Sequence, residues 1–161
     1  GDGGSMLLRG RIDRIDLTPD GARARVLDYK TGKVGARDDC FAGGTTLQLP
    51  IYLCAAEALL ANVAATLAAY RHVTEAGGYK TVQFTREALE RHWDRFREIL
   101  LTIAEGVRSG RFFAGMPSGG EDGACKWCDF RPVCRSAAVA ASRAKSRDPA
   151  AERFICMRGI E

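Results

Sequence analysis

Two stretches in which apolar and polar residues alternate, 7–17 and 23–30, constrain the fold of this chain more than any other feature of its sequence. Alternation with a period of two is typical of a β-strand that buries one of its faces. The sequence Thr-Pro-Asp-Gly at 18–21 lies between the two stretches. It favours a tight turn, because proline presets one backbone dihedral angle and glycine adopts conformations that other residues avoid. The chain is therefore expected to begin with a β-hairpin.

A helix and a second hairpin are expected next. A run rich in leucine and alanine from Leu47 to Asn62 predicts the helix, with Pro50 in its first turn. Proline is tolerated there, because the first backbone N–H groups of a helix have no partner within it. The stretches 66–73 and 79–84 alternate again and predict the second hairpin, which turns at the two glycines 77–78.

Length and composition favour a single domain over 1–161, because two domains in 161 residues would each have too small a core. With 46% hydrophobic and 27% charged residues, the chain has an ordinary globular composition. No apolar run approaches the ~20 residues that cross a membrane, and the first residues do not resemble a signal peptide. We therefore expect no membrane association and a cytoplasmic location. The expected parts are a core sheet with its helix over 7–84, a long helix over 85–110 that Thr85 caps and Gly110 ends, a cysteine cluster over 125–134, and a C-terminal helix and tail over 136–161.

The charge of the chain gives weak support for a polyanionic partner. Its net charge of +4 rests on nineteen arginines and only five lysines. The planar guanidinium group suits bidentate contacts with phosphate, which favours nucleic acid. A composition rich in arginine and alanine can equally reflect a GC-rich genome, so charge alone decides nothing.

Two carboxylates and an amine are expected to meet at the first hairpin. Asp28 and Lys30 are two residues apart in the second predicted strand and therefore share one face of it. Asp13, in the preceding strand, can reach the same face. Two carboxylates so close repel each other unless a cation lies between them, and Mg²⁺ accepts one or two carboxylates together with waters and phosphate oxygens.

Such a group of residues is suited to hydrolysis of a phosphodiester bond. Mg²⁺ held by Asp13 and Asp28 would polarise the phosphate and lower the pKa of a bound water, while Lys30 orients the water or stabilises the developing charge. The alternative is an exposed hairpin in which Asp28 and Lys30 form a surface ion pair worth less than about 1 kcal/mol.

Gln48 and Tyr52 are four residues apart at the start of the predicted helix, which places them on one face. Both side chains could point into the same cleft as the carboxylates. The alternative is an ordinary amphipathic helix with a half-buried tyrosine.

Three cysteines close together suggest a metal centre. Cys125, Cys128 and Cys134 form a C-x2-C-x5-C pattern, and a C-x2-C turn can direct two sulfurs at one ion. In a cytosolic protein, metal binding is a more common use of such cysteines than disulfides. A fourth ligand could come from any of three other cysteines, which spacing does not distinguish: Cys40, Cys54 and Cys156. The alternative is a set of buried thiols.

The order and spacing of these motifs resemble the RecB-like branch of the PD-(D/E)XK nuclease superfamily. The matching patterns are Gly-x-Ile-Asp ending at Asp13, Asp-Tyr-Lys from Asp28 to Lys30, and Gln-x-x-x-Tyr from Gln48 to Tyr52, within a resemblance over 8–135. It implies an α/β fold, a restriction-endonuclease-like mixed β-sheet flanked by helices, with the first hairpin at its centre.

The same resemblance implies the roles of the site residues. Asp13, Asp28 and the backbone carbonyl of Tyr29 would bind Mg²⁺ or Mn²⁺, Lys30 would be the catalytic lysine, and the glutamine and tyrosine would border the active site and the DNA strand. The implied activity is metal-dependent DNA cleavage in a RecB- or AddB-like repair protein, with DNA and a helicase domain or subunit as partners. Members of the family carry a helix before the first strand. We expect that helix to be absent here, which leaves the activity of the isolated chain open.

The cysteine pattern is similar to the iron–sulfur staple of AddB-type proteins. In that comparison Cys125, Cys128 and Cys134 match the three downstream ligands, and the fourth would precede this chain, which implies a 4Fe-4S cluster in a longer parent protein. Two other functions stay open. One is a catalytically inactive nuclease-like module that binds DNA or a helicase partner, and the other is an interaction domain stabilised by zinc.

Overall fold

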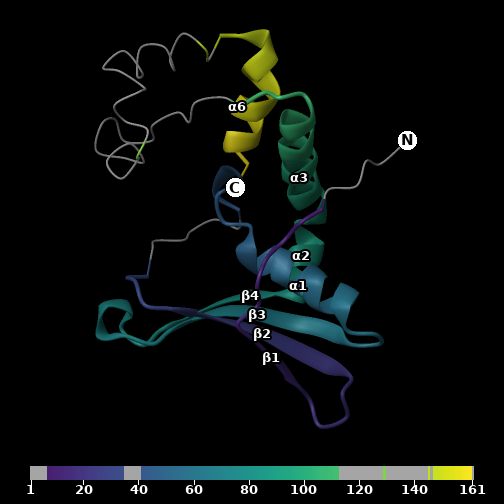
Figure 1. The fold of residues 1–161 in the computed structure, drawn as a ribbon, viewed down its shortest axis with the longest axis vertical. Helices are drawn as coiled ribbons and strands as arrows, with labels where there is room; N and C mark the ends of the chain where they lie inside the picture. The colour runs from purple at the N-terminus through teal and green to yellow at the C-terminus, as the bar shows by residue number, and fades with distance from the viewer. Residues whose placement is uncertain (1–6, 35–40, 113–128, 130–144, 146, 161) are drawn as a thin grey trace. The chain divides into compact units, whose positions relative to one another are not determined.

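The computed structural model describes residues 7–34, 41–112, 129, 145 and 147–160. These residues fall into two compact units, one up to Ile99 that also includes Ile160, and one from Leu100 to Gly159 (Figure 1). Cys125, Cys128 and Cys134 lie outside the described residues, as does most of the helix expected to begin at 136. In the part of the chain that the structure describes, no helix has the length and apolar character needed to span a membrane.

A mixed four-stranded sheet forms the centre of the first unit, which confirms the expected fold class. Its strands are β1 (Arg14–Leu17), β2 (Arg23–Lys30), β3 (Ala64–His72) and β4 (Thr81–Thr85), and they lie in that order. The outer pairs are antiparallel and the β2–β3 pair is parallel. The expectation that the first hairpin would be central is confirmed for β2, which pairs on both sides, and wrong for β1, which lies at the edge of the sheet. The crossover through the next helix places β3 beside β2.

Helix α1 (Gln48–Leu59) connects β2 to β3 and covers one face of the sheet (Figure 1). Its buried residues include Leu53 and Ala56, and the face of β2 toward it carries Ala24, Val26 and Asp28, all buried. Small side chains on β3, such as Ala68, let the helix approach closely. The predicted helix is confirmed, with proline as its third residue.

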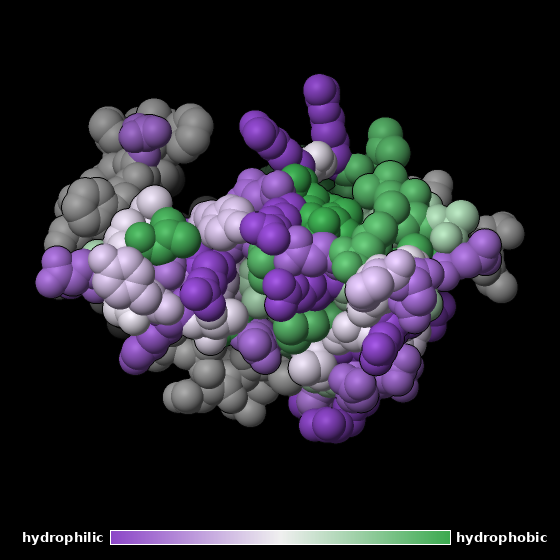
Figure 2. All heavy atoms as spheres, turned by 90° about the horizontal axis from the view of Figure 1, so that it is seen from below, coloured by the Kyte–Doolittle hydropathy of each residue, from purple (hydrophilic) through white to green (hydrophobic). Residues whose placement is uncertain are grey.

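Hydrophobic residues also occupy the middle of the other face. The alternate positions of β2 and β3 place Leu27, Leu67 and Ala69 on the side away from α1. Arg25 and Arg71 share that side. Figure 2, which views the molecule from below, shows a patch of apolar atoms on this side, with hydrophilic side chains across and around it.

An aromatic cluster closes the first unit beside the sheet. The ring of Phe41 is fully buried, and its centroid lies 6.1 Å from that of Phe84, 6.4 Å from that of His92 and 5.7 Å from that of Phe96. Aromatic pairs at these separations bury large areas and favour tilted or edge-on geometry. Phe41 belongs to the polar, glycine-rich stretch 32–46, where the sequence indicated no core residue.

The helix expected over 85–110 is interrupted at His92, which separates α2 (Arg86–Arg91) from α3 (Trp93–Arg108). The backbone N–H of His92 is shared between two carbonyl oxygens, each 3.2 Å away, and its imidazole packs edge-on against Phe41. Tertiary packing therefore overrides the local helical pattern here. The expected cap and stop are confirmed, because Thr85 accepts a hydrogen bond from the N–H of Ala88 and Gly110 has a φ of +65°.

The second unit contains the end of α3, a short 3-10 turn (Pro149–Ala151) and α6 (Glu152–Arg158). Asp148 caps this turn, since its Oδ1 accepts a hydrogen bond from the N–H of Ala150 at 2.9 Å. An ion pair joins Arg153 of α6 to Glu105 of α3. The last helix thus lies within the segment that the sequence suggested would be a tail.

Candidate active site

Asp28 is the buried centre of a polar network at the end of β2. Its side chain faces α1, and only 5% of the residue is exposed. Oδ1 accepts a hydrogen bond from Nε2 of Gln48 at 3.1 Å, and the hydroxyl of Tyr52 lies 3.4 Å from the same oxygen. A carboxylate is costly to bury unless such partners stabilise its charge.

Lys30 lies beside Asp28, as the period of the strand predicts. Its Nζ is 2.6 Å from Oδ2 of Asp28 and donates a hydrogen bond to Oε1 of Gln48 at 3.0 Å. The ammonium also lies over the ring of Tyr70, 4.7 Å from the centroid, in a cation–π contact. About a third of the lysine side chain is exposed (36%), so the site is accessible from solvent along this residue.

Gln48 and Tyr52 reach the site from adjacent turns of α1. Nε2 of Gln48 lies 2.8 Å from the tyrosine hydroxyl, which in turn donates to the carbonyl oxygen of Arg11 at 2.7 Å. Burial is the main cause that raises the pKa of Tyr52, and the nearby charge of Asp28 adds to it. The phenol therefore stays neutral at physiological pH and serves as a hydrogen-bonding group.

Asp13 comes directly before β1 and is exposed. Its Oδ2 accepts a hydrogen bond from the backbone N–H of Tyr29 at 3.0 Å. Since Arg14 pairs with Leu27, the register places Asp13 opposite Asp28. The backbone of Tyr29 lies between the two functional side chains of β2, while its own ring is on the other face of the sheet.

The five side chains that the sequence singled out, together with Tyr29, thus lie at one end of the sheet: Asp13, Asp28, Lys30, Gln48 and Tyr52. Their roles, and that of the carbonyl of Tyr29 as a metal ligand, stay predictions.

The donor set fits a magnesium ion held partly by water and substrate. Within the described residues, no group of three or more His, Cys, Asp or Glu side chains is gathered for a metal. Mg²⁺ does not require one, because it commonly takes one or two carboxylates and keeps several waters. Oδ2 of Asp28 is shielded from solvent and accepts no hydrogen bond of good geometry from the described residues. Its neighbour is the cation of Lys30, so this oxygen already faces a positive charge.

A fixed turn follows Lys30, and no sequence pattern indicated it. Three successive carbonyl oxygens are held: that of Lys30 by the N–H of Val73 at 3.1 Å, that of Thr31 by Oγ1 of Thr74 at 2.8 Å, and that of Gly32 by Nδ1 of His72 at 2.9 Å. The imidazole is therefore assigned a proton on Nδ1. These partners are about forty residues away in sequence, where a local pattern cannot reveal them.

Replacing Gly77 with alanine should loosen this turn. A Cβ atom there would lie 2.6 Å from Cβ of His72, 2.7 Å from its Nδ1 and 2.9 Å from the carbonyl oxygen of Gly32. Gly32 contributes a backbone oxygen, and the ring of His72 is bonded to that oxygen, so neither can move aside easily. We therefore expect a loss of about 1–3 kcal/mol in unfolding free energy. Urea denaturation measures it. Gly10→Ala is the control, since its Cβ would meet nothing within 4 Å; equal midpoints for the two variants would contradict the packing.

Two cysteines outside the predicted cluster are described. Cys54 is half-buried on α1, Cys156 is exposed on α6, and both are free thiols. Burial raises the pKa of the Cys54 thiol, which disfavours the thiolate that binds metals. The iron–sulfur prediction for Cys125, Cys128 and Cys134 stays untested, because those residues are not described.

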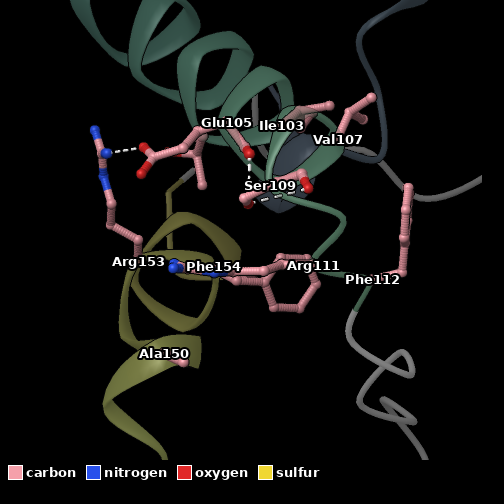
Figure 3. A pocket seen from close by; sticks show the side chains of 11 residues that line it. Ile103, Glu105, Val107, Ser109, Arg111, Phe112, Ala150, Arg153 and Phe154 are labelled. Carbon is pink, nitrogen blue, oxygen red and sulfur yellow. Dashed lines mark hydrogen bonds and ion pairs between the residues drawn. The ribbon is translucent and has the colours of Figure 1, made fainter.

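The second unit contains an apolar cavity of about 260 Å³ between the end of α3 and α6 (Figure 3). Ile103, Val107, Phe112 and Phe154 supply much of its lining. Glu105 also lines the cavity, and its carboxylate forms an ion pair with Arg153. The lining of this cavity is mainly apolar. The ion pair of Asp28 and Lys30 belongs to the first unit.

Comparison with known proteins agrees with this geometry. Residues 1–135 match the family model described as the PD-(D/E)XK nuclease superfamily. Two relatives are named as subunits of an "ATP-dependent helicase/deoxyribonuclease". One, from Symbiobacterium thermophilum, is 52% identical over 56 residues, which is 33% of this chain and 5% of the relative. The other, from Pelotomaculum thermopropionicum, is 43% identical over 54 residues, 32% of this chain and 5% of the relative.

These matches cover about a third of the chain and a twentieth of the relatives' length. No solved structure matches the chain significantly. The family model, in contrast, extends over most of the sequence and includes the strands and helix that bring Asp28, Lys30 and Gln48 together. The chain belongs to the PD-(D/E)XK nuclease superfamily.

Proposed function

We propose that this chain is a Mg²⁺-dependent DNA nuclease domain that hydrolyses phosphodiester bonds at the site around Asp28. The observation that carries the proposal is the network in which one buried carboxylate, one partly exposed ammonium and one amide contact each other. Relatives named helicase/deoxyribonuclease subunits support DNA as the substrate and a helicase domain or subunit as the partner. The site would then serve a repair assembly in the cytoplasm.

Asp13 and Asp28 are the residues that would hold Mg²⁺, or Mn²⁺ in its place, and the carbonyl of Tyr29 is the third candidate ligand. When bound, the ion supplies a Lewis acid that polarises the phosphate and lowers the pKa of water. The hydrogen bond from the N–H of Tyr29 fixes the orientation of the Asp13 carboxylate beside β2. Asp28 lies within β2, and Asp13, directly before β1, is held to the backbone of β2 by this bond, which favours a fixed geometry.

Lys30 would act on the substrate. Its side chain is partly exposed, and its ammonium would donate a hydrogen bond to a phosphate oxygen or to the attacking water, where it stabilises negative charge. Gln48 accepts from Lys30 and donates to Asp28, so the amide sets the distance between the two. Tyr52 links α1 to the carbonyl of Arg11 and thereby holds the segment that carries Asp13.

Cleavage of linear single- and double-stranded DNA by the full chain tests the proposal. We expect cleavage with Mg²⁺ or Mn²⁺ and none in EDTA. Asp16→Asn is the control variant, because Asp16 pairs with Arg14 and Arg25 outside the site, and it should cleave as the wild type does. No cleavage with either metal, or undiminished cleavage in EDTA, would overturn the proposal. The first of these results would favour the inactive module that binds DNA or a helicase.

A further inference from the structure

We propose that a pocket beside Lys30 binds a second phosphate of the nucleic-acid strand, next to the one that is cleaved. The pocket has a volume of about 160 Å³, and its lining includes Lys30, Gly32, Lys33, Tyr70, His72 and Val82. This inference rests on the proposed function, since it assumes that a nucleic-acid strand reaches Asp28. It adds a binding residue, Lys33, that none of the sequence motifs includes.

The charge of the lining favours an anion. Among the described residues it carries two lysines and one imidazole and has no carboxylate. Lys30 shares its charge with Asp28, which lies 2.6 Å away. Lys33 forms no ion pair with a carboxylate in the part of the chain that the structure describes. Its charge is therefore available to a ligand.

The pocket has a fixed floor. The carbonyl oxygen of Gly32 would repel an anion if it faced the pocket without a partner, but Nδ1 of His72 occupies it at 2.9 Å. The bonds from Val73 and Thr74 hold the two preceding carbonyls. Lys33 thus directly follows a turn whose backbone is held at three successive positions. This reduces the conformational entropy that the lysine loses when it binds a ligand.

The spacing of the two lysines suits neighbouring phosphates. Lys33 follows Lys30 by three residues, so their Cα atoms are at most about 11 Å apart, and both side chains line one pocket. Tyr70 and Val82 form an apolar wall, and Lys30 lies against the tyrosine ring. A phosphate at Lys30 and a second one at Lys33 would position the strand along the end of β2.

Binding of a single-stranded oligonucleotide to the full chain in EDTA, followed by fluorescence anisotropy, tests the pocket without requiring activity. We expect Lys33→Gln to raise Kd about tenfold. The slope of log K against log salt should fall by about one, as for loss of one phosphate contact. Lys80→Gln is the matched control, because Lys80 is exposed and does not line the pocket. Equal Kd and salt slope in wild type and Lys33→Gln would overturn the subsite.

Cleavage of modified substrates then locates the phosphate. A neutral methylphosphonate is placed at each position around the cleaved bond in turn. At one flanking position, the methylphosphonate should raise the KM of the wild type and change its kcat by less than about twofold. At that position it should not raise the KM of Lys33→Gln further. Additive losses at every position would contradict a contact between Lys33 and one phosphate. If the wild type binds DNA but never cleaves it with metal, the nuclease proposal fails, and the binding data still decide the subsite.

Discussion

Asparagine in place of Asp28 is expected to lower kcat for DNA cleavage about 10³-fold. The substitution removes the negative charge that would hold the metal. It also places a neutral amide beside the ammonium of Lys30, whose Nζ lies 2.6 Å from Oδ2 of Asp28 in the wild type. Metal-ion catalysis contributes several kcal/mol to transition-state stabilisation, and about 4 kcal/mol corresponds to a factor of 10³. Single-turnover kinetics with saturating enzyme measure the change.

The loss should not come from unfolding. Asparagine has nearly the volume of aspartate, and its Oδ1 can still accept the hydrogen bond from Gln48. We therefore expect the circular dichroism spectrum to match that of the wild type. Asp16→Asn makes the same chemical change on the other face of the sheet and should keep wild-type kcat. A kcat for Asp28→Asn within threefold of the wild type would show that Asp28 does not act in the reaction.

Alanine in place of Phe41 is expected to have the largest effect on stability, a loss of about 3–5 kcal/mol in unfolding free energy. The ring is fully buried and contacts the rings of Phe84, His92 and Phe96. Its removal leaves a cavity among three aromatic groups that β4, the break at His92 and α3 hold in place, so the site can collapse only in part.

Urea denaturation of the full chain measures this loss. Leu59→Ala is the control, because Leu59 at the end of α1 is 72% exposed and should change the free energy by less than about 0.5 kcal/mol. Similar urea midpoints for the two variants would show that Phe41 is not a core residue.

The strands β2, β3 and β4, α1 and the shared faces of the candidate site residues could be predicted because each depends on a local period, whereas the strand expected over 7–17 extends only from Arg14 to Leu17. A period of two places Asp28 and Lys30 on one face, and a spacing of four places Gln48 and Tyr52 on adjacent turns of a helix. The observed hydrogen bonds agree with both. Asp13 could be placed only approximately, since β1 begins after it and its position depends on pairing with β2.

The features that could not be predicted depend on contacts between distant residues. Phe41 belongs to a polar stretch of the sequence, and its burial depends on aromatic rings that come from β4, α3 and the break at His92. That break depends on the same packing, so a helical pattern alone predicts a continuous helix. The turn after Lys30 is held by His72 across forty residues, and in the sequence Gly77 indicates only a bend.

Calorimetric titration of Mn²⁺ or Mg²⁺ into the full chain tests the central claim most directly, because it measures metal binding apart from activity. The wild type and Asp16→Asn should each bind the ion at a site that Asp28→Asn and Asp13→Asn lose. Absence of binding in the wild type, or equal binding in Asp28→Asn, would contradict the claim that these carboxylates form the metal site of a nuclease.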